Sequence, residues 1–135
     1  MKGRWIFHKF GGSSLADADC FRRVAGILLD YSDERIGVVV SAMGGMTDAL
    51  LRLVVLAEQD CDDFNDELHD IGELYTETAR SLVNGDSLVA VLDGWSQDAE
   101  DITDVLKAIA RDKSAPRRSR DVVAGYGEIW AARLL

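Results

Sequence analysis

The sequence has little proline and little cysteine, and each shortage excludes a class of protein. One proline in 135 residues, with 47% hydrophobic and 29% charged residues, excludes a proline-rich disordered chain and favours a helix-rich globular domain. Cys20 and Cys61 are far apart and lack metal-ligand spacing, which is typical of reduced cytosolic thiols rather than of a disulfide framework. We therefore expect one cytoplasmic domain with a single core.

Long hydrophobic runs and dense positive charge are also missing. No apolar run approaches the roughly 20 residues that cross a membrane, and the apolar stretch near the N-terminus is too short for a signal peptide. The formal net charge is −9, and the only densely basic segment is SAPRRSR at 114–120. These features predict no membrane partner and no nucleic-acid partner. They also mean that any anionic ligand must be held by local positive groups.

The hydrophobic pattern predicts a strand, a helix and a second strand at the start of the chain. Residues 5–10 are predicted to form a short buried strand, bounded by two glycines. Residues 36–40 are a β-branched run without alternation, as in a strand covered on both faces. Between them, apolar residues recur at helical spacing, and Ser13, Ser14 and Asp17 are candidate helix caps. Two strands joined by a helix over this length predict a right-handed parallel crossover.

The rest of the chain is predicted to be helical. An apolar helix is expected over residues 48–59, and residues 62–112 are expected to form a helical hairpin that breaks near Asn84 and Gly85. We expect a connector over residues 114–120 and then a helix over residues 121–135 that is interrupted at Gly125–Gly127. The predicted fold class is α/β.

Each predicted strand runs into a glycine loop and then a helix. The first loop reads KFGGSS from Lys9, and the second reads SAMGGMTD from Ser41. Unpaired backbone N–H groups and the helix dipole both favour negative charge at such a place. Neither loop is a GxxxxGK[ST] or a GxGxxG sequence. The pattern therefore predicts an anion site built from two loops, without assigning it to either nucleotide-binding motif.

Lys9 is the candidate catalytic residue. A lysine beside a glycine loop supplies the positive charge that a transferring phosphoryl group needs, although a surface lysine at a strand end has the same appearance in sequence. Gly11, Gly12 and Ser13 are candidate phosphate contacts, because adjacent glycines let an anion approach the backbone; the alternative is a simple tight turn.

Ser41, Thr47 and Glu128 are candidate substrate-binding residues. Thr47 either offers its hydroxyl to a ligand carboxylate or caps the helix expected from Asp48. Glu128 either recognises a ligand ammonium group or complements the dipole at a helix N-terminus. The two histidines, His8 and His69, lack the spacing of a metal site or a catalytic triad. We treat both as structural and predict no metal site.

Three motifs in this sequence resemble the N-terminal part of aspartokinases, within the amino-acid kinase superfamily. They are HKFGGSS at 8–14, VVVSAMGGMTD at 38–48 and YGEIWAARLL at 126–135, and they follow the family's order and approximate spacing over essentially the whole chain. The resemblance implies a three-layer α/β/α fold, with residues 1–135 as the aspartate-binding part. GEIWAARLL is further similar to bifunctional aspartokinases, including those fused to diaminopimelate decarboxylase.

The resemblance implies ATP-dependent phosphorylation of the L-aspartate β-carboxylate to 4-phospho-L-aspartate, the first step toward lysine, threonine and methionine. It implies Mg²⁺ bound mainly by the nucleotide, and a homo-oligomer in the full-length enzyme. Lys9 resembles the lysine that neutralises charge on the transferring phosphoryl group. Glu128 resembles the carboxylate that holds the aspartate amino group. The family's phosphate-side loop and the hydroxyls near the aspartate are matched by Gly11, Gly12, Ser13, Ser41 and Thr47.

Aspartokinases run to several hundred residues, and their later parts supply the adenine pocket and the ACT-type regulatory domains. We therefore expect the nucleotide-binding half and the regulatory domains to be absent here, and the chain to be a piece of a longer enzyme that is inactive or poorly active alone. Two alternatives stay open: a non-catalytic amino-acid-binding or interaction module, and a kinase that acts on another amino acid such as glutamate.

Overall fold

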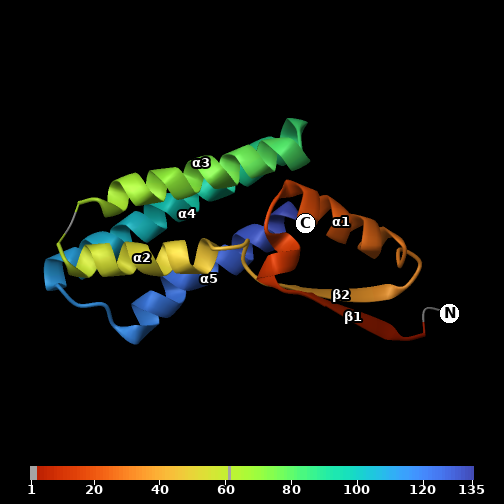
Figure 1. Cartoon of the computed structure of the whole chain (residues 1–135), viewed down its shortest axis with the longest axis horizontal. Helices are drawn as coiled ribbons and strands as arrows, with labels where there is room; N and C mark the ends of the chain where they lie inside the picture. Colours follow the sequence, from red (N-terminus) through yellow and green to blue (C-terminus); the bar gives the residue numbers. More distant parts are fainter. Residues whose placement is uncertain (1–2, 61) are drawn as a thin grey trace.

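The protein combines a small parallel sheet with a bundle of helices (Figure 1). The structure is a computed structural model that describes residues 3–60 and 62–135. Within these residues, no helix has the length and apolar character needed to cross a membrane. The elements in chain order are β1 (Trp5–Phe10), η1 (Gly12–Leu15), α1 (Ala18–Leu29), β2 (Arg35–Val40), α2 (Met46–Glu58), α3 (Phe64–Leu82), α4 (Gly85–Asp112) and α5 (Arg117–Leu134).

The strand–helix–strand unit forms as predicted. Strands β1 and β2 are hydrogen-bonded neighbours and run parallel, with α1 between them in the chain. Of the three candidate caps, the structure uses Asp17, whose carboxylate accepts a hydrogen bond from the Cys20 backbone N–H at 2.9 Å. Cys20 is a free thiol, and Cys61 lies outside the described residues. The α/β fold class is therefore confirmed.

The expectations that residues 5–10 form a buried strand and that residues 36–40 are covered on both faces are wrong. Trp5, Phe7 and Val39 share one face of the sheet and are 57%, 72% and 53% exposed. On the opposite face, Val38 and Val40 line a cavity whose other walls are Leu28 of α1 and the end of α5. An unbroken apolar run predicts burial without specifying what packs on each face. Here helices cover only one of them, and only in part, since Val38 is still exposed.

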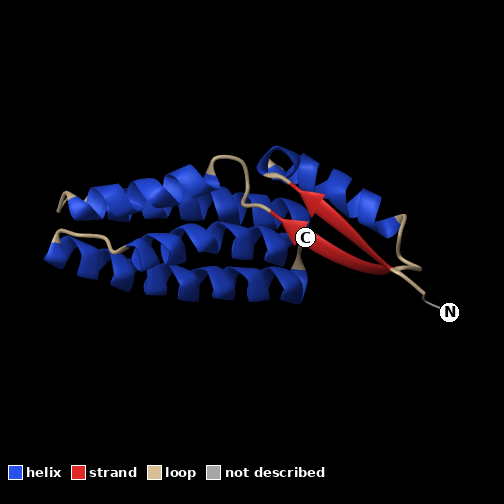
Figure 2. Ribbon diagram, turned by 90° about the horizontal axis from the view of Figure 1, so that it is seen from below, coloured by secondary structure: helices blue, strands red, loops and turns tan. Residues whose placement is uncertain are grey.

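Helices α2–α5 lie side by side and enclose the main core (Figure 2). The hairpin of α3 and α4 matches the prediction for residues 62–112. Helix α5 differs from its prediction, because it runs without a break from Arg117 to Leu134. It begins at Arg117, inside the expected connector, with Pro116 as its N-cap. The buried packing of Gly127 offsets the roughly 1 kcal/mol cost of a glycine in a helix.

Candidate functional site

A cavity of about 350 Å³ opens where the two glycine loops meet α5. Because β1 and β2 are parallel, their carboxyl ends meet at one edge of the sheet, so loops distant in sequence become neighbours. The start of α2 and the middle of α5 complete the walls. The lining residues are Gly12, Ser13, Ser41, Ala42, Met43, Gly44, Gly45, Thr47, Asp48 and Glu128.

The structure brings most of the sequence-predicted site residues together in this cavity. Two do not line it. Lys9 is exposed near the end of β1, on the sheet face that carries Val39, and Gly11 follows the last residue of that strand. The predicted residues that do line the cavity are Gly12, Ser13, Ser41, Thr47 and Glu128.

The second glycine loop presents a helix start to the cavity. Gly45 is the N-cap of α2 and has a φ of 76°, a left-handed conformation that favours glycine. Helix α2 begins at Met46, so Thr47 lies inside the first turn, and the alternative in which Thr47 caps the helix is wrong. The first-turn N–H groups of a helix lack intrahelical acceptors. This end of α2 can therefore bind an anion beside the half-buried Thr47 hydroxyl.

Glu128 supplies a carboxylate to the opposite wall. It lies in the middle of α5 rather than at its N-terminus, so the helix-dipole alternative is wrong, since the dipole acts within the first and last turns. Its side chain is exposed at the cavity. Across residues 3–60 and 62–135, no ion pair engages this carboxylate. It is free to accept charge-assisted hydrogen bonds from a ligand ammonium group.

The lining residues include a second carboxylate, Asp48, which the sequence reasoning missed as a site residue. Asp48 stands in the first turn of α2, where the helix dipole favours negative charge. Its position next to Thr47 at a predicted helix start was the available signal. Among the residues that the structure describes, no lysine or arginine lines the cavity, so a ligand carboxylate depends on hydroxyls and backbone N–H groups. Within the part of the chain that the structure describes, no cluster of three or more potential metal ligands occurs.

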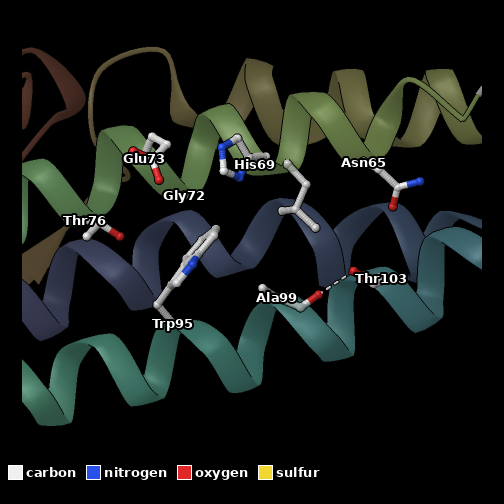
Figure 3. Close-up of a pocket in the computed structure, with 9 residues that line it drawn as sticks. Asn65, His69, Gly72, Glu73, Thr76, Trp95, Ala99 and Thr103 are labelled. Carbon is white, nitrogen blue, oxygen red and sulfur yellow. Dashed lines mark hydrogen bonds between the residues drawn. The ribbon is translucent and has the colours of Figure 1, made fainter.

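A second cavity, of about 310 Å³, lies between α3 and α4 (Figure 3). His69 and Glu73 of α3 line it opposite Trp95 of α4. Gly72 makes room for the indole ring, because a Cβ there would lie 2.6 Å from Trp95 Cζ2. Its lining residues all belong to α3 and α4, and no glycine loop contributes to it. We therefore place the candidate site in the loop cavity.

The fold and the cavity together define an α/β protein in which two glycine loops follow parallel strands and the Glu128 carboxylate lines the same cavity. The chain matches the amino acid kinase family over residues 4–135 and belongs to that family.

Several relatives sharpen this assignment. The chain is 35% identical to the chloroplastic bifunctional aspartokinase/homoserine dehydrogenase 2 of Arabidopsis thaliana, covering 97% of this chain and 14% of the relative. It is 35% identical to chloroplastic aspartokinase 3 of the same plant, covering 93% and 22%. The structure of E. coli aspartokinase III in complex with aspartate and ADP superposes with a TM-score of 0.80 at 26% identity, covering 97% and 28%.

The predicted resemblance to aspartokinases is thus confirmed, and the chain spans less than a third of each of these relatives. The bifunctional relative carries a homoserine dehydrogenase, and the similarity to a diaminopimelate decarboxylase fusion stays a prediction. The relatives include chloroplastic and bacterial proteins, so the cytoplasmic location also stays a prediction.

Proposed function

We propose that this chain forms the aspartate-binding part of an aspartate kinase, which transfers the γ-phosphoryl group of ATP to the β-carboxylate of L-aspartate. One observation carries the proposal: a single cavity sets hydroxyls and a helix start opposite a carboxylate that forms no ion pair within the described residues. Membership of the amino acid kinase family supports it. So does the likeness to E. coli aspartokinase III, whose structure holds aspartate and ADP.

The polarity of the cavity suits an amino acid. Glu128 accepts hydrogen bonds from the substrate ammonium group, while the hydroxyls of Ser41 and Thr47 and the first-turn N–H groups of α2 hold a substrate carboxylate. A zwitterion needs both kinds of group at a fixed separation. Binding at both ends directs the remaining carboxylate of aspartate toward the first glycine loop.

The first glycine loop and Lys9 bind and neutralise the phosphate groups in the proposed reaction. Phosphoryl transfer depends chiefly on positioning and on charge stabilisation. Lys9 precedes Gly11, Gly12 and Ser13 in the chain and does not line the loop cavity. In this role it neutralises charge on the transferring group rather than binding aspartate. Mg²⁺ is held mainly by the ATP phosphates, because this ion prefers phosphate and water oxygens as ligands.

A complete kinase needs more chain than these 135 residues. The sequence spans 22% of aspartokinase 3 and 28% of the solved aspartokinase III. We propose that residues 1–135 are the N-terminal part of the kinase domain, and that the adenine pocket and regulatory domains belong to further segments. The roles in lysine biosynthesis and in a homo-oligomer belong to that whole enzyme.

The binding half of the proposal is tested by titrating the 135-residue chain with L-aspartate and following backbone amide shifts by NMR. We expect shifts at Gly44, Gly45, Thr47 and Glu128, with a Kd on the order of 1–10 mM because only part of a substrate site is present. Shifts confined to the α3–α4 cavity, or no saturable shifts, would contradict the proposal. Tighter binding of L-glutamate would favour the alternative substrate.

The transfer half is tested in a chimera in which residues 1–135 replace the matching segment of E. coli aspartokinase III. We expect aspartate-dependent formation of ADP. Lys9→Ala should lower kcat by about 10²-fold or more with little change in KM for aspartate, since the group acts on developing charge. Lys107→Ala, at an exposed lysine of α4, is the matched control. An inactive chimera that still binds aspartate would favour the non-catalytic module, and equal activity of the two lysine variants would refute the role of Lys9.

A further inference from the structure

Helix α5 approaches the second glycine loop more closely than any side chain would allow. Gly127 is buried, and a Cβ built on it would lie 2.8 Å from the Ala42 Cβ and 3.4 Å from the Met46 Cγ. Ala42 is itself buried and directly follows Ser41. Gly125 of the same helix has nothing within 4 Å of its built Cβ. The absence of a side chain therefore matters at position 127 and not at 125.

One turn further along, α5 is anchored to α3 and α4. The indole N–H of Trp130 donates to the Asp98 carboxylate at 2.9 Å, and the Arg133 guanidinium donates to the same oxygen at 2.5 Å. The Tyr75 hydroxyl donates to the Trp130 carbonyl at 3.3 Å. Trp130 is fully buried and Asp98 nearly so. These contacts oppose a rotation or a retreat of α5 from the loop.

We propose that Gly127 is a positioning residue for Glu128: its missing side chain lets α5 close onto Ala42, and this contact fixes the Glu128 carboxylate opposite the Ser41–Thr47 loop. The inference rests on the proposed function, in which Glu128 holds the substrate ammonium group. Glu128 lies between the Gly127 contact and the Trp130 anchor in the chain, so both ends of its helical turn are fixed.

A methyl group at position 127 cannot be accommodated without movement. The contact would be shorter than Cβ atoms show, and the opposing atom belongs to a buried alanine without rotamers to change. Either the loop or the helix must shift. Each movement changes the separation between Glu128 and the hydroxyls that hold the other end of the ligand. A misplacement of about 1 Å is enough to weaken a two-ended interaction severely.

The experiment compares L-aspartate with succinate, which has the same two carboxylates but no ammonium group. The preference, defined as Kd for succinate divided by Kd for L-aspartate, is measured by NMR titration of the 135-residue chain. Gly127→Ala should reduce this preference by about tenfold. Gly125→Ala, the matched control in the same helix, should leave it unchanged. An unchanged preference in a folded Gly127→Ala protein would overturn the proposal.

The double variant Gly127→Ala with Ala42→Gly separates positioning from general damage. Removing the opposing methyl relieves the contact, so the preference should return to that of the original chain. If the single variant does not fold, the double variant alone decides: a folded protein with restored preference supports the proposal. A double variant that is unfolded or shows no preference overturns it.

Glu128→Gln distinguishes failure of this inference from failure of the proposed function. It should abolish the preference while sparing succinate binding, since only the ammonium contact is lost. If Glu128→Gln keeps the preference, Glu128 does not hold the ammonium group, and both proposals fail. If Glu128→Gln abolishes the preference but Gly127→Ala does not, the function stands and only the positioning role of Gly127 is wrong.

Discussion

The helical bundle and the strand end of this protein are packed in opposite ways. In α2–α5, large side chains such as Trp130, Tyr75 and Leu106 are fully closed from solvent. In the strands, Trp5 and Phe7 stack on each other on an exposed sheet face. Both regions are rich in apolar residues, so composition alone does not separate them.

The difference shows how the candidate site divides its tasks. The loops that offer hydroxyls and N–H groups extend from the thinly packed strand end, whereas Glu128 is carried by α5 in the bundle. Burial of apolar surface is the main source of folding free energy. Measured stability should therefore report on the bundle, and ligand binding on the junction between the two regions.

The largest effect is expected from removing the central aromatic side chain of the bundle. Trp130→Ala should destabilise the protein by about 4 kcal/mol, because it leaves a cavity and removes the indole hydrogen bond to Asp98. Trp5→Ala, the same substitution on the exposed sheet face, should cost no more than about 0.5 kcal/mol. Urea unfolding followed by far-UV circular dichroism measures both. Similar losses in the two variants would break the comparison, because they would place the strand face in the stabilising core.

A smaller but clear effect is expected from the buried carboxylate that links α4 to α5. Asp98→Ala should destabilise the protein by about 3 kcal/mol, because it leaves the buried Trp130 N–H without an acceptor and Arg133 without its ion pair. Asp104→Ala, at an exposed position of the same helix, is the control and should change stability by less than about 0.5 kcal/mol. Chemical denaturation of the two variants measures the difference. If Asp98→Ala matched its control, the polar link would contribute nothing to holding α5 on the bundle.

The elements that could be predicted from sequence are those with local signals. The spacing of apolar residues predicts helix α1 and the two strands, and glycines and other turn residues mark the loops that follow the strands. Parallel strands bring their ends together, which is why Ser41 and Gly12 were correctly grouped. The continuity of α5 was not predictable, because the local cost of Gly125 and Gly127 is outweighed by packing against α2.

Long-range polar contacts were equally hidden in the sequence. From sequence alone, Asp98 and Arg133 are indistinguishable from ordinary surface charges. Nothing in their neighbouring residues shows that α4 and α5 meet around Trp130. The exposure of Phe7 was missed for a related reason, because a β-branched or aromatic run does not reveal which of its faces is covered. That Glu128 forms no ion pair with any residue the structure describes likewise depends on contacts that only the folded chain defines.

The smallest effect concerns an ion pair at the end of α2 opposite the site. The Glu58 carboxylate accepts hydrogen bonds from Arg120 at 2.8 Å and from the Ala115 N–H at 3.0 Å. The Arg120 side chain first, and then the Ala115 N–H, hold the pKa of Glu58 below its ordinary value. A carboxyl group with a lowered pKa in the folded state adds stability above its unfolded-state pKa of about 4.3. That contribution is lost as the pH falls through the folded-state pKa.

Glu58→Gln should therefore lower the urea midpoint slightly at neutral pH, and the difference from the original protein should vanish in acid. The change stays small because the pair is partly open to solvent and screened by it. Glu77→Gln, on the exposed side of α3, is the control and should show no such convergence. Since Glu58 lies outside the cavity lining, the preference for L-aspartate over succinate should be unchanged. A loss of that preference in Glu58→Gln would mean that the far end of the bundle also sets the site, and stability and binding could no longer be assigned to separate regions.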